Sequence, residues 1–190
     1  MENTSIDIIL IQEPYVAYNK LQGNFICISH PSFHIVTPIP MLSKNIVSER
    51  PCTLTYIRKS SCLEFSPRYN LYQDTDMQII ELTMEPESFF IINIYNKKQR
   101  SCIDSSMTGP RSNPPHTPRY TVNRLLLPLK VKAPTILVGD FNLHHPRWNT
   151  AADPTKISKA QPLVHWLDRY KAKLLVCAEE INEHGGILLR

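Results

Sequence analysis

Long hydrophobic runs are absent from this 190-residue sequence. No apolar stretch approaches the roughly 18 residues that a membrane-spanning helix needs. The N-terminus carries Glu2 where a secretory signal would carry bases, and no cleavage-site pattern follows it. Hydrophobic residues still make up 42% of the chain, too many for a disordered protein. We therefore expect a soluble, intracellular domain with no membrane partner, long enough to bury one core.

Paired cysteines are also absent. The five cysteines are scattered along the chain, and no C-x-x-C pair occurs: they are Cys27, Cys52, Cys62, Cys102 and Cys177. An odd, scattered set argues against both a disulfide framework and a zinc site. We expect reduced cysteines that act as small apolar residues.

Acidic residues are scarce in one segment, which runs from Lys97 to Lys132. Its one acid is Asp104, and its formal charge is +7, whereas the remainder has thirteen bases against sixteen acids, or −3. The eight bases are Lys97, Lys98, Arg100, Arg111, Arg119, Arg124, Lys130 and Lys132. Such a segment would draw a polyanion to one region, although a solvated basic loop fits the composition equally well. Lys97, Lys98 and Arg100 are the candidate nucleic-acid contacts.

Hydrophobic patterning predicts many strands and few helices. The predicted strands are residues 5–13, 25–28, 34–36, 53–58, 77–84, 89–95, 135–138 and 174–176, with a hairpin turn at 84–88. Helices are predicted from Thr117-Pro118 to Pro128 and over residues 159–170. Residues 96–118 form a basic, proline-rich loop. This order predicts one α/β domain over residues 1–190, a layered sandwich of mixed β-sheets flanked by helices.

Two carboxylates stand at the C-terminal ends of predicted strands, Glu13 and Asp140. Buried carboxylates cost desolvation free energy unless they are paired or bind a cation. Strand ends that are distant in sequence can converge on one site in an α/β fold. Hard oxygen ligands suit Mg²⁺ or Mn²⁺, which keep several waters. Each segment alone is a weak signal, because a strand-end acid is often only a cap for the next loop.

Three motifs together are much more specific. They are Gln12-Glu13-Pro14, Asn93-Ile94-Tyr95 and Gly139-Asp140-Phe141-Asn142, the last continuing through His144-His145-Pro146 to Trp148. In this order and spacing they resemble the endonuclease/exonuclease/phosphatase superfamily. The chain is most similar to the apurinic-type endonuclease domain of LINE-like (non-LTR) retrotransposons, over nearly its whole length.

The resemblance implies a role for each motif residue. Glu13 would bind the metal, and Tyr95 would hydrogen-bond the scissile phosphate in its transition state. Asp140 would orient or deprotonate the attacking water, and Asn142 would hold the phosphate beside it. Without the resemblance, Tyr95 would be a core aromatic and Asn142 a loop cap. The implied protein is a Mg²⁺-dependent DNA endonuclease with nuclear access and no small-molecule cofactor, and its groups match the needs of phosphodiester hydrolysis.

The other motif residues have plainer interpretations. His144 and His145 lack zinc-ligand spacing, and we expect a structural or DNA-facing role for them. Trp148 is expected to pack under its loop. Asn93 shares a strand face with Tyr95, so a supporting contact is expected.

The resemblance also implies groups that this sequence lacks. The family has a metal-site asparagine before the Gln-Glu-Pro strand, and further strands with a histidine and aspartates beyond the position of Arg190. We therefore expect a domain incomplete at both ends, with uncovered sheet edges and low activity. Two hypotheses follow: a DNA-nicking endonuclease, or a catalytically dead retroelement remnant that at most binds nucleic acid. A phosphatase acting on a small substrate is disfavoured by His144–Trp148 and the basic loop.

Overall fold

The computed structural model describes residues 6–97, 120–130, 134–149, 151–175 and 186–189. Its strands are β1 (Ile8–Gln12), β2 (Val16–Asn19), β3 (Asn24–Cys27), β4 (Phe33–Val36), β5 (Ile46–Val47), β6 (Thr53–Arg58), β7 (Glu64–Pro67), β8 (Met77–Met84), β9 (Glu87–Tyr95), β10 (Thr135–Asp140), β11 (Lys173–Leu175) and β12 (Gly186–Leu189). Its helices are the π-helix η1 (Val122–Leu126), the 3₁₀-helix η2 (Pro154–Lys156) and α1 (Ile157–Arg169). None of the helices in these ranges is long and apolar enough to cross a membrane.

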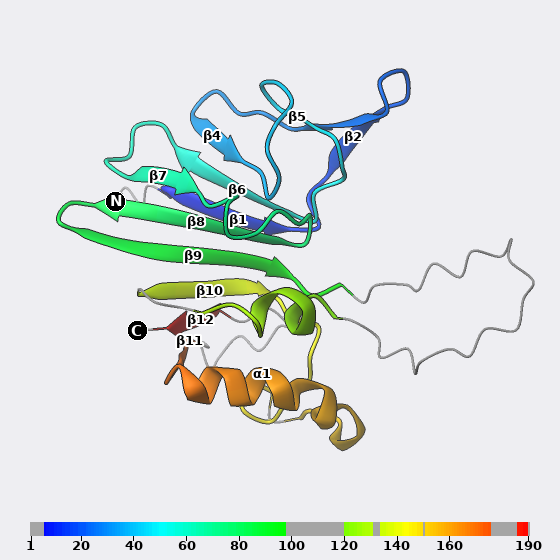
Figure 1. The fold of residues 1–190 in the computed structure, drawn as a ribbon, viewed down its shortest axis with the longest axis vertical. Coiled ribbons are helices and arrows are strands. Elements are labelled where there is room, and N and C mark those ends of the chain that lie inside the picture. The colour runs from blue at the N-terminus through cyan, green and yellow to red at the C-terminus, as the bar shows by residue number, and fades with distance from the viewer. Residues whose placement is uncertain (1–5, 98–119, 131–133, 150, 176–185, 190) are drawn as a thin grey trace, which may run out of the picture.

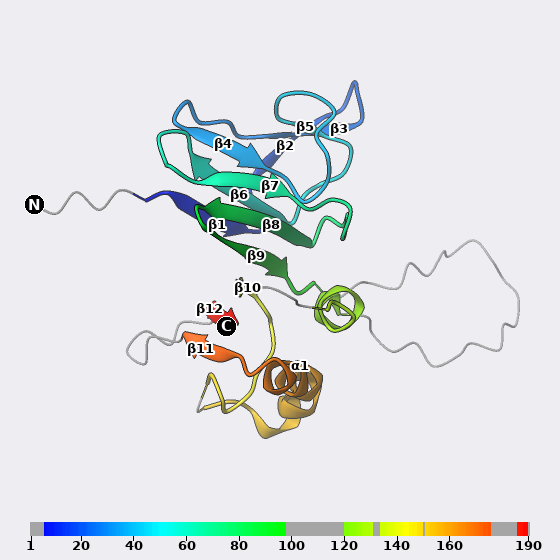
Figure 2. The ribbon, with the colours of Figure 1, turned by 60° about the vertical axis from the view of Figure 1, so that its left-hand side comes forward.

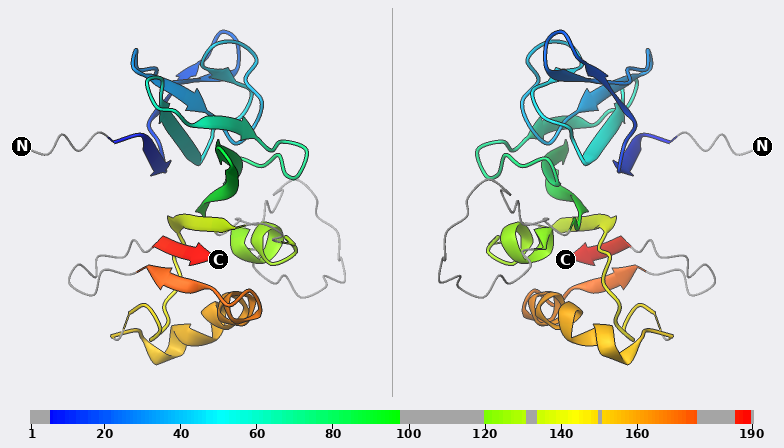
Figure 3. Two further views of the ribbon diagram at one scale, coloured as in Figure 1. Left: turned by 90° about the vertical axis from the view of Figure 1, so that its left-hand side faces the viewer. Right: turned by 90° about the vertical axis from the view of Figure 1, so that its right-hand side faces the viewer.

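The strands form three sheets that are stacked in layers. A six-stranded sheet has the order β11-β12-β10-β9-β8-β7, and two three-stranded sheets have the orders β1-β6-β4 and β2-β3-β5. The sheet β1-β6-β4 faces one side of the six-stranded sheet, and α1 and η1 lie on its other side (Figures 1 and 2). Two further side views show the blue and cyan strands of the N-terminal half above the six-stranded sheet and the orange α1 below it (Figure 3). The expected α/β layered sandwich is confirmed, with α1 and η1 on one face of the six-stranded sheet.

Alternating side chains on β8 explain why the layers pack. Met77 and Ile79 lie in the core beside α1 and η1, whereas Ile80 and Leu82 lie in the core beside β4 and β6. A strand covered on both faces must be apolar on both faces, and β8 and β9 meet that requirement. The α1 side of the core is completed by residues such as Leu163 and Leu167, which are fully buried.

The three described cysteines, Cys27, Cys52 and Cys62, are free thiols. Burial raises the pKa of Cys27 to about 11. Burial, followed by contact with Asp76, raises the pKa of Cys52 to about 12. Both thiols therefore stay protonated and pack as small apolar groups, as expected, whereas Cys62 is exposed.

Several predicted elements appear at or near their expected bounds. β6 and β8 match residues 53–58 and 77–84, and the turn at 84–88 joins β8 to β9 as an antiparallel hairpin with Met84 opposite Glu87. α1 begins two residues before the predicted helix and ends one residue before its predicted end. Four further strands, β2, β5, β7 and β12, were not predicted from the sequence.

Two expectations need correction. β12 pairs antiparallel with both β10 and β11, although no strand was expected in the last residues. The helix expected to reach Pro128 is a π-helix in its described part, because the Leu127 N–H donates to the Val122 carbonyl at 3.0 Å across five residues. Its expected start at Thr117-Pro118, and the basic loop beyond Lys97, lie outside the described residues.

Asn93 on β9 joins the six-stranded sheet to the sheet β1-β6-β4. Its side chain is fully buried. Its Oδ1 accepts from Gln12 Nε2 at 2.6 Å, and its Nδ2 donates to the Leu54 carbonyl at 3.1 Å. The contact expected from its strand face is therefore present. Because Gln12 precedes Glu13, this amide holds the end of β1 against β9.

We expect Asn93→Ala to lower the free energy of unfolding by about 1–3 kcal/mol, because the Gln12 amide and the Leu54 carbonyl would lose a buried partner. Urea denaturation measures this change. Ser88→Ala, at an exposed position on the same strand, should change it by less than about 0.5 kcal/mol. Equal losses in the two variants would mean that the buried amide has no special role.

Candidate functional site

Three strand ends that are distant in sequence meet at one edge of the sheets. Tyr95 ends β9 and Asp140 ends β10, and the two residues are direct partners in the parallel β9–β10 pair. Glu13 follows β1, and its Oε1 accepts a hydrogen bond from the Tyr95 hydroxyl at 2.5 Å. The structure thus brings Glu13 and Asp140 to either side of Tyr95, the arrangement expected from the motifs.

The two carboxylates control the protonation of Tyr95. The hydrogen bond to Glu13 raises the pKa of Tyr95 strongly, and burial and the negative charges of Glu13 and Asp140 raise it further. The hydroxyl therefore remains protonated throughout the neutral and mildly alkaline range. It is a neutral hydrogen-bond donor placed in a region of negative potential, where a cation would be attracted.

Two of the predicted site residues have an uncommon backbone conformation. Among the described non-glycine residues, positive φ angles occur at Glu13 (51°), Asn142 (48°) and Lys171 (51°). Such a conformation costs about 1–3 kcal/mol and tends to occur at functional sites, with Asn tolerating it best. Glu13 is held in place by its N–H, which donates to the Cys52 carbonyl at 2.9 Å. The strain thus supports a functional role for this edge.

Asn142 acts directly on Asp140. The Asn142 N–H donates to Asp140 Oδ1 at 3.0 Å, and its side-chain Nδ2 donates to Oδ2 at 3.1 Å. Both carboxylate oxygens are therefore oriented by one residue. Asn142 therefore caps the turn after β10, the role expected for it without the family resemblance. The same two bonds fix the Asp140 carboxylate.

Gly139 allows β10 to lie close to β9 just before Asp140. A Cβ at this position would come closer than 3.0 Å to three atoms of Ile94, including its backbone carbonyl oxygen. No larger residue fits without separating the two strands, and that separation would move Asp140 away from Tyr95. The close approach of β9 therefore explains why this position of the Gly139–Asn142 motif is a glycine.

Asn96 is a positioning residue that the sequence analysis did not identify. Its N–H donates to the Asp140 carbonyl at 2.8 Å, and its Nδ2 donates to the Phe141 carbonyl at 2.5 Å. Its Oδ1 accepts from the Val122 N–H at 3.0 Å. The side chain is buried, and it holds the backbone around Asp140 against the start of η1.

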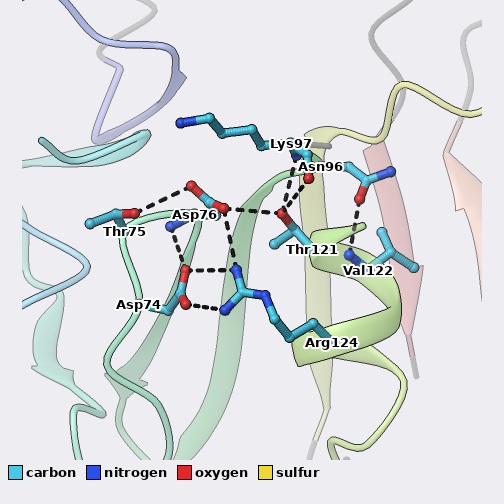
Figure 4. Close-up of polar contacts among 8 residues, drawn as sticks. All are labelled: Asp74, Thr75, Asp76, Asn96, Lys97, Thr121, Val122 and Arg124. Carbon is cyan, nitrogen blue, oxygen red and sulfur yellow. Dashed lines mark hydrogen bonds and ion pairs between the residues drawn. The ribbon is translucent and has the colours of Figure 1, made fainter. Parts of the chain in front are cut away.

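An ion-pair cluster braces the same region (Figure 4). Arg124 on η1 pairs with Asp74 and, at 3.3 Å, with Asp76 Oδ2. The hydrogen bond to Asp74 raises the pKa of Arg124 although burial opposes that rise. Arg124 is one of the eight bases expected to attract a polyanion, and that expectation is wrong for this residue, because two aspartates neutralise its charge. The only sequence signal for the cluster is the Asp74-Thr75-Asp76 spacing just before β8.

Lys97 lies at the other end of this cluster. Its N–H donates to Thr121 Oγ1 at 3.1 Å, and the Thr121 hydroxyl lies 3.2 Å from both the Lys97 carbonyl and Asp76 Oδ2. The chain therefore leaves β9 and returns to η1 at adjacent points. Lys98 and Arg100, the other two candidate nucleic-acid contacts, lie outside the described residues, so the nucleic-acid role of all three remains a prediction.

The residues after Asn142 support the loop. Trp148 Nε1 donates to the Leu143 carbonyl at 2.9 Å, which confirms that Trp148 packs under its loop. His145 Nδ1 accepts from the Arg147 N–H at 3.1 Å, and its ring lies 5.1 Å from that of Trp148. His145 therefore has a structural role here, one of the two expected for the histidine pair.

The donor set suits one kind of metal. Within the described ranges, no three His, Cys, Asp or Glu side chains are grouped so as to hold an ion. Glu13 and Asp140 supply two carboxylates beside Tyr95. Such a set does not fit zinc, which needs three or four protein ligands. It fits Mg²⁺, which is held by one or two carboxylates and completes its shell with water and substrate phosphate.

We expect Asn96→Ala to lower the free energy of unfolding by about 1–3 kcal/mol, because the Phe141 carbonyl and the Val122 N–H would lose a buried partner. Chemical denaturation measures the loss. Gln73→Ala, in the exposed part of the loop beside Asp74, is the matched control and should be close to neutral. An Asn96→Ala variant with the wild-type free energy of unfolding would contradict the proposed positioning contact.

Comparisons with known proteins agree with this geometry. No curated protein matches the sequence. Among solved structures, the endonuclease domain of TRAS1, a telomere-specific non-LTR retrotransposon, matches with a TM-score of 0.59 and 12% identity, covering 97% of this chain and 73% of that domain. At this identity the match shows the fold. The sequence model described as endonuclease-reverse transcriptase matches residues 89–185, just over half of the chain and including both Tyr95 and Asp140. The chain therefore belongs to the endonuclease-reverse transcriptase family, a family of retrotransposon endonucleases within the endonuclease/exonuclease/phosphatase superfamily.

Proposed function

We propose that this chain hydrolyses phosphodiester bonds in DNA with Mg²⁺ or Mn²⁺ as its cofactor. The observation that carries the proposal is the meeting of three strand ends: the Tyr95 hydroxyl donates to Glu13, and Tyr95 is the direct strand partner of Asp140. The family match supports a nuclease. A DNA substrate requires access to the nucleus in a cell that has one.

Asp140 is the proposed acceptor of the proton from the attacking water. Asn142 orients both oxygens of its carboxylate, so that one oxygen can face the water in a fixed direction. The water oxygen forms a bond to phosphorus as Asp140 receives the proton. The bond from phosphorus to the leaving ester oxygen breaks, and that oxygen acquires a proton from solvent.

Tyr95 and Glu13 are proposed to stabilise the charge that develops on the phosphate. Glu13 would hold the cation, and Asp140, the strand partner of Tyr95, would share it through water. With Glu13 on the cation, the Tyr95 hydroxyl, which donates to Glu13 in the free chain, would turn its one proton to a non-bridging phosphate oxygen. A bound Mg²⁺ would neutralise negative charge on the phosphate oxygens.

We expect Asp140→Ala to lower the rate of plasmid nicking by about 10²–10⁴-fold, because the proton acceptor is lost. Conversion of supercoiled plasmid to open circles measures the rate, with Mg²⁺, Mn²⁺ or EDTA present. Asp7→Ala, at the half-buried residue just before β1 that pairs with Arg58, serves as the matched control and should keep the wild-type rate.

Nicking that persists in EDTA, or that Asp140→Ala leaves unchanged, would refute the proposed chemistry. DNA binding without any metal-dependent nicking would instead support the remnant hypothesis. The two outcomes are separated by measuring binding and nicking on the same preparations.

We expect Tyr95→Phe to lower the nicking rate by about 10²–10³-fold with little change in DNA affinity, because the lost donor acts on the transition state. Tyr69→Phe is the control. In EDTA, where no cation lies beside Glu13, the raised pKa of Tyr95 should keep this hydroxyl protonated near pH 10, where an ordinary tyrosine is half ionised. Ultraviolet difference spectra of wild type and Tyr95→Phe measure this, and a tyrosinate signal at that pH that only wild type shows would contradict the raised pKa.

A further inference from the structure

The β2–β3 hairpin exposes large side chains that a folded domain normally covers. Tyr15 is 76% exposed, Tyr18 is 55% exposed, and Leu21 at the turn is 99% exposed. Single exposed apolar residues are common, but a group of them on one element marks an interaction surface. Tyr15 lies just before β2, Tyr18 on β2 and Leu21 in the turn, and all three side chains are open to solvent.

The hairpin begins beside the proposed catalytic residues. Tyr15 follows Glu13 by two positions, and the two exposed residues flank Pro14, which is buried. β2 leaves the end of β1 on the side of the molecule where β9 and β10 also end (Figure 1). A substrate phosphate held at Glu13 and Tyr95 would therefore place its neighbouring nucleotides near Tyr15.

Charge favours a polyanion at this surface. Residues 14–48 contain no Asp or Glu, and their two charged bases are Lys20 and Lys44. Both lysines are exposed. Aromatic rings beside unopposed positive charge fit nucleic acid, whose bases stack on aromatic rings and whose phosphates attract lysine.

The hairpin is held in a defined shape. Asn19 Oδ1 accepts from the Leu21 N–H at 3.1 Å, and the Gly23 N–H donates to the Asn19 carbonyl at 2.9 Å. Gly23 has a φ of 65°, which glycine adopts without strain. The Tyr18 and Phe25 rings pack with centroids 5.0 Å apart. A surface ordered in advance loses little conformational entropy when it binds.

We propose that the β2–β3 hairpin is a DNA-binding arm that lies along the DNA beside the scissile phosphate. Tyr15 stacks on a nucleotide next to the one held at Glu13, and Lys20 contacts a backbone phosphate farther along. The proposal rests on the proposed function in taking DNA as the ligand. It assigns DNA binding to a surface far in sequence from the basic segment between Lys97 and Lys132.

Fluorescence anisotropy of the 190-residue chain with a labelled single-stranded DNA, whose base faces are open to stacking, tests the arm in EDTA. Tyr15→Ala should raise the Kd about 5- to 100-fold, the range expected for the loss of one stacking contact. Tyr15→Phe keeps the ring and should stay within about twofold of wild type. Met84→Ala, at another exposed apolar position, in the β8–β9 turn, should leave the Kd unchanged. An unchanged Kd in Tyr15→Ala would overturn the proposal.

Salt dependence separates the two contacts. Lys20→Ala should lower the slope of log K against log salt by about one, because one phosphate contact is lost. Tyr15→Ala should weaken binding at every salt concentration with an unchanged slope. Thermal unfolding checks that each variant folds as wild type does, which is expected because both side chains are exposed.

The same variants distinguish failure of the arm from failure of the proposed function. If DNA binding depends on Tyr15 but the chain never nicks DNA, the DNA-binding arm is supported and the proposed hydrolysis is refuted. If nicking depends on Asp140 but the Kd does not depend on Tyr15, the hydrolysis is supported and the arm is refuted. A dimer in size-exclusion chromatography that Tyr15→Ala dissociates, with DNA affinity unchanged, would show that the hairpin binds a second copy and would overturn the proposal.

Discussion

The buried amide of Asn93 spans two sheets, and the position of every proposed catalytic group depends on that connection. β9 carries both Asn93 and Tyr95. Asn93 bonds to Gln12 at the end of β1, and Tyr95 bonds to Glu13, the next residue along the chain. β10 is in parallel register with β9 and places Asp140 beside Tyr95. A shift of one sheet against the other would break the polar contact and separate the carboxylates in the same movement.

The site combines strained residues with a rigid support. Glu13 and Asn142 both have positive φ angles, which is unfavourable for Glu in particular. The surrounding contacts offset this cost. Asn96 donates to the carbonyls of both Asp140 and Phe141. Nearby, Arg124 neutralises Asp74 and Asp76. Groups held in this way need little rearrangement when a substrate binds, which is the condition for electrostatic stabilisation of a transition state.

The sequence predicted those parts of the molecule whose signal is local. β6 and β8 show their own apolar patterns, and both appear at the predicted bounds. β5 and β7 are short or contain polar residues and proline, and they are strands because a neighbour pairs with them. Similarly, Glu13, Tyr95 and Asp140 stand in recognisable motifs, so their meeting was predictable, although their catalytic roles remain predictions. The contact between Asp76 and Arg124 joins residues 48 positions apart and has no local pattern.

The bond between Lys97 and Thr121 closes a loop at its base, next to Asp140. The entropic cost of holding two points together grows only with the logarithm of the number of residues between them, about 0.6 kcal/mol for each doubling. Residues can thus be inserted, deleted or exchanged between these two anchors while the distance from Tyr95 to Asp140 stays the same. The length and composition of this connection can therefore change in evolution at little cost in the free energy of folding, while the parallel pairing of β9 with β10 keeps Tyr95 beside Asp140.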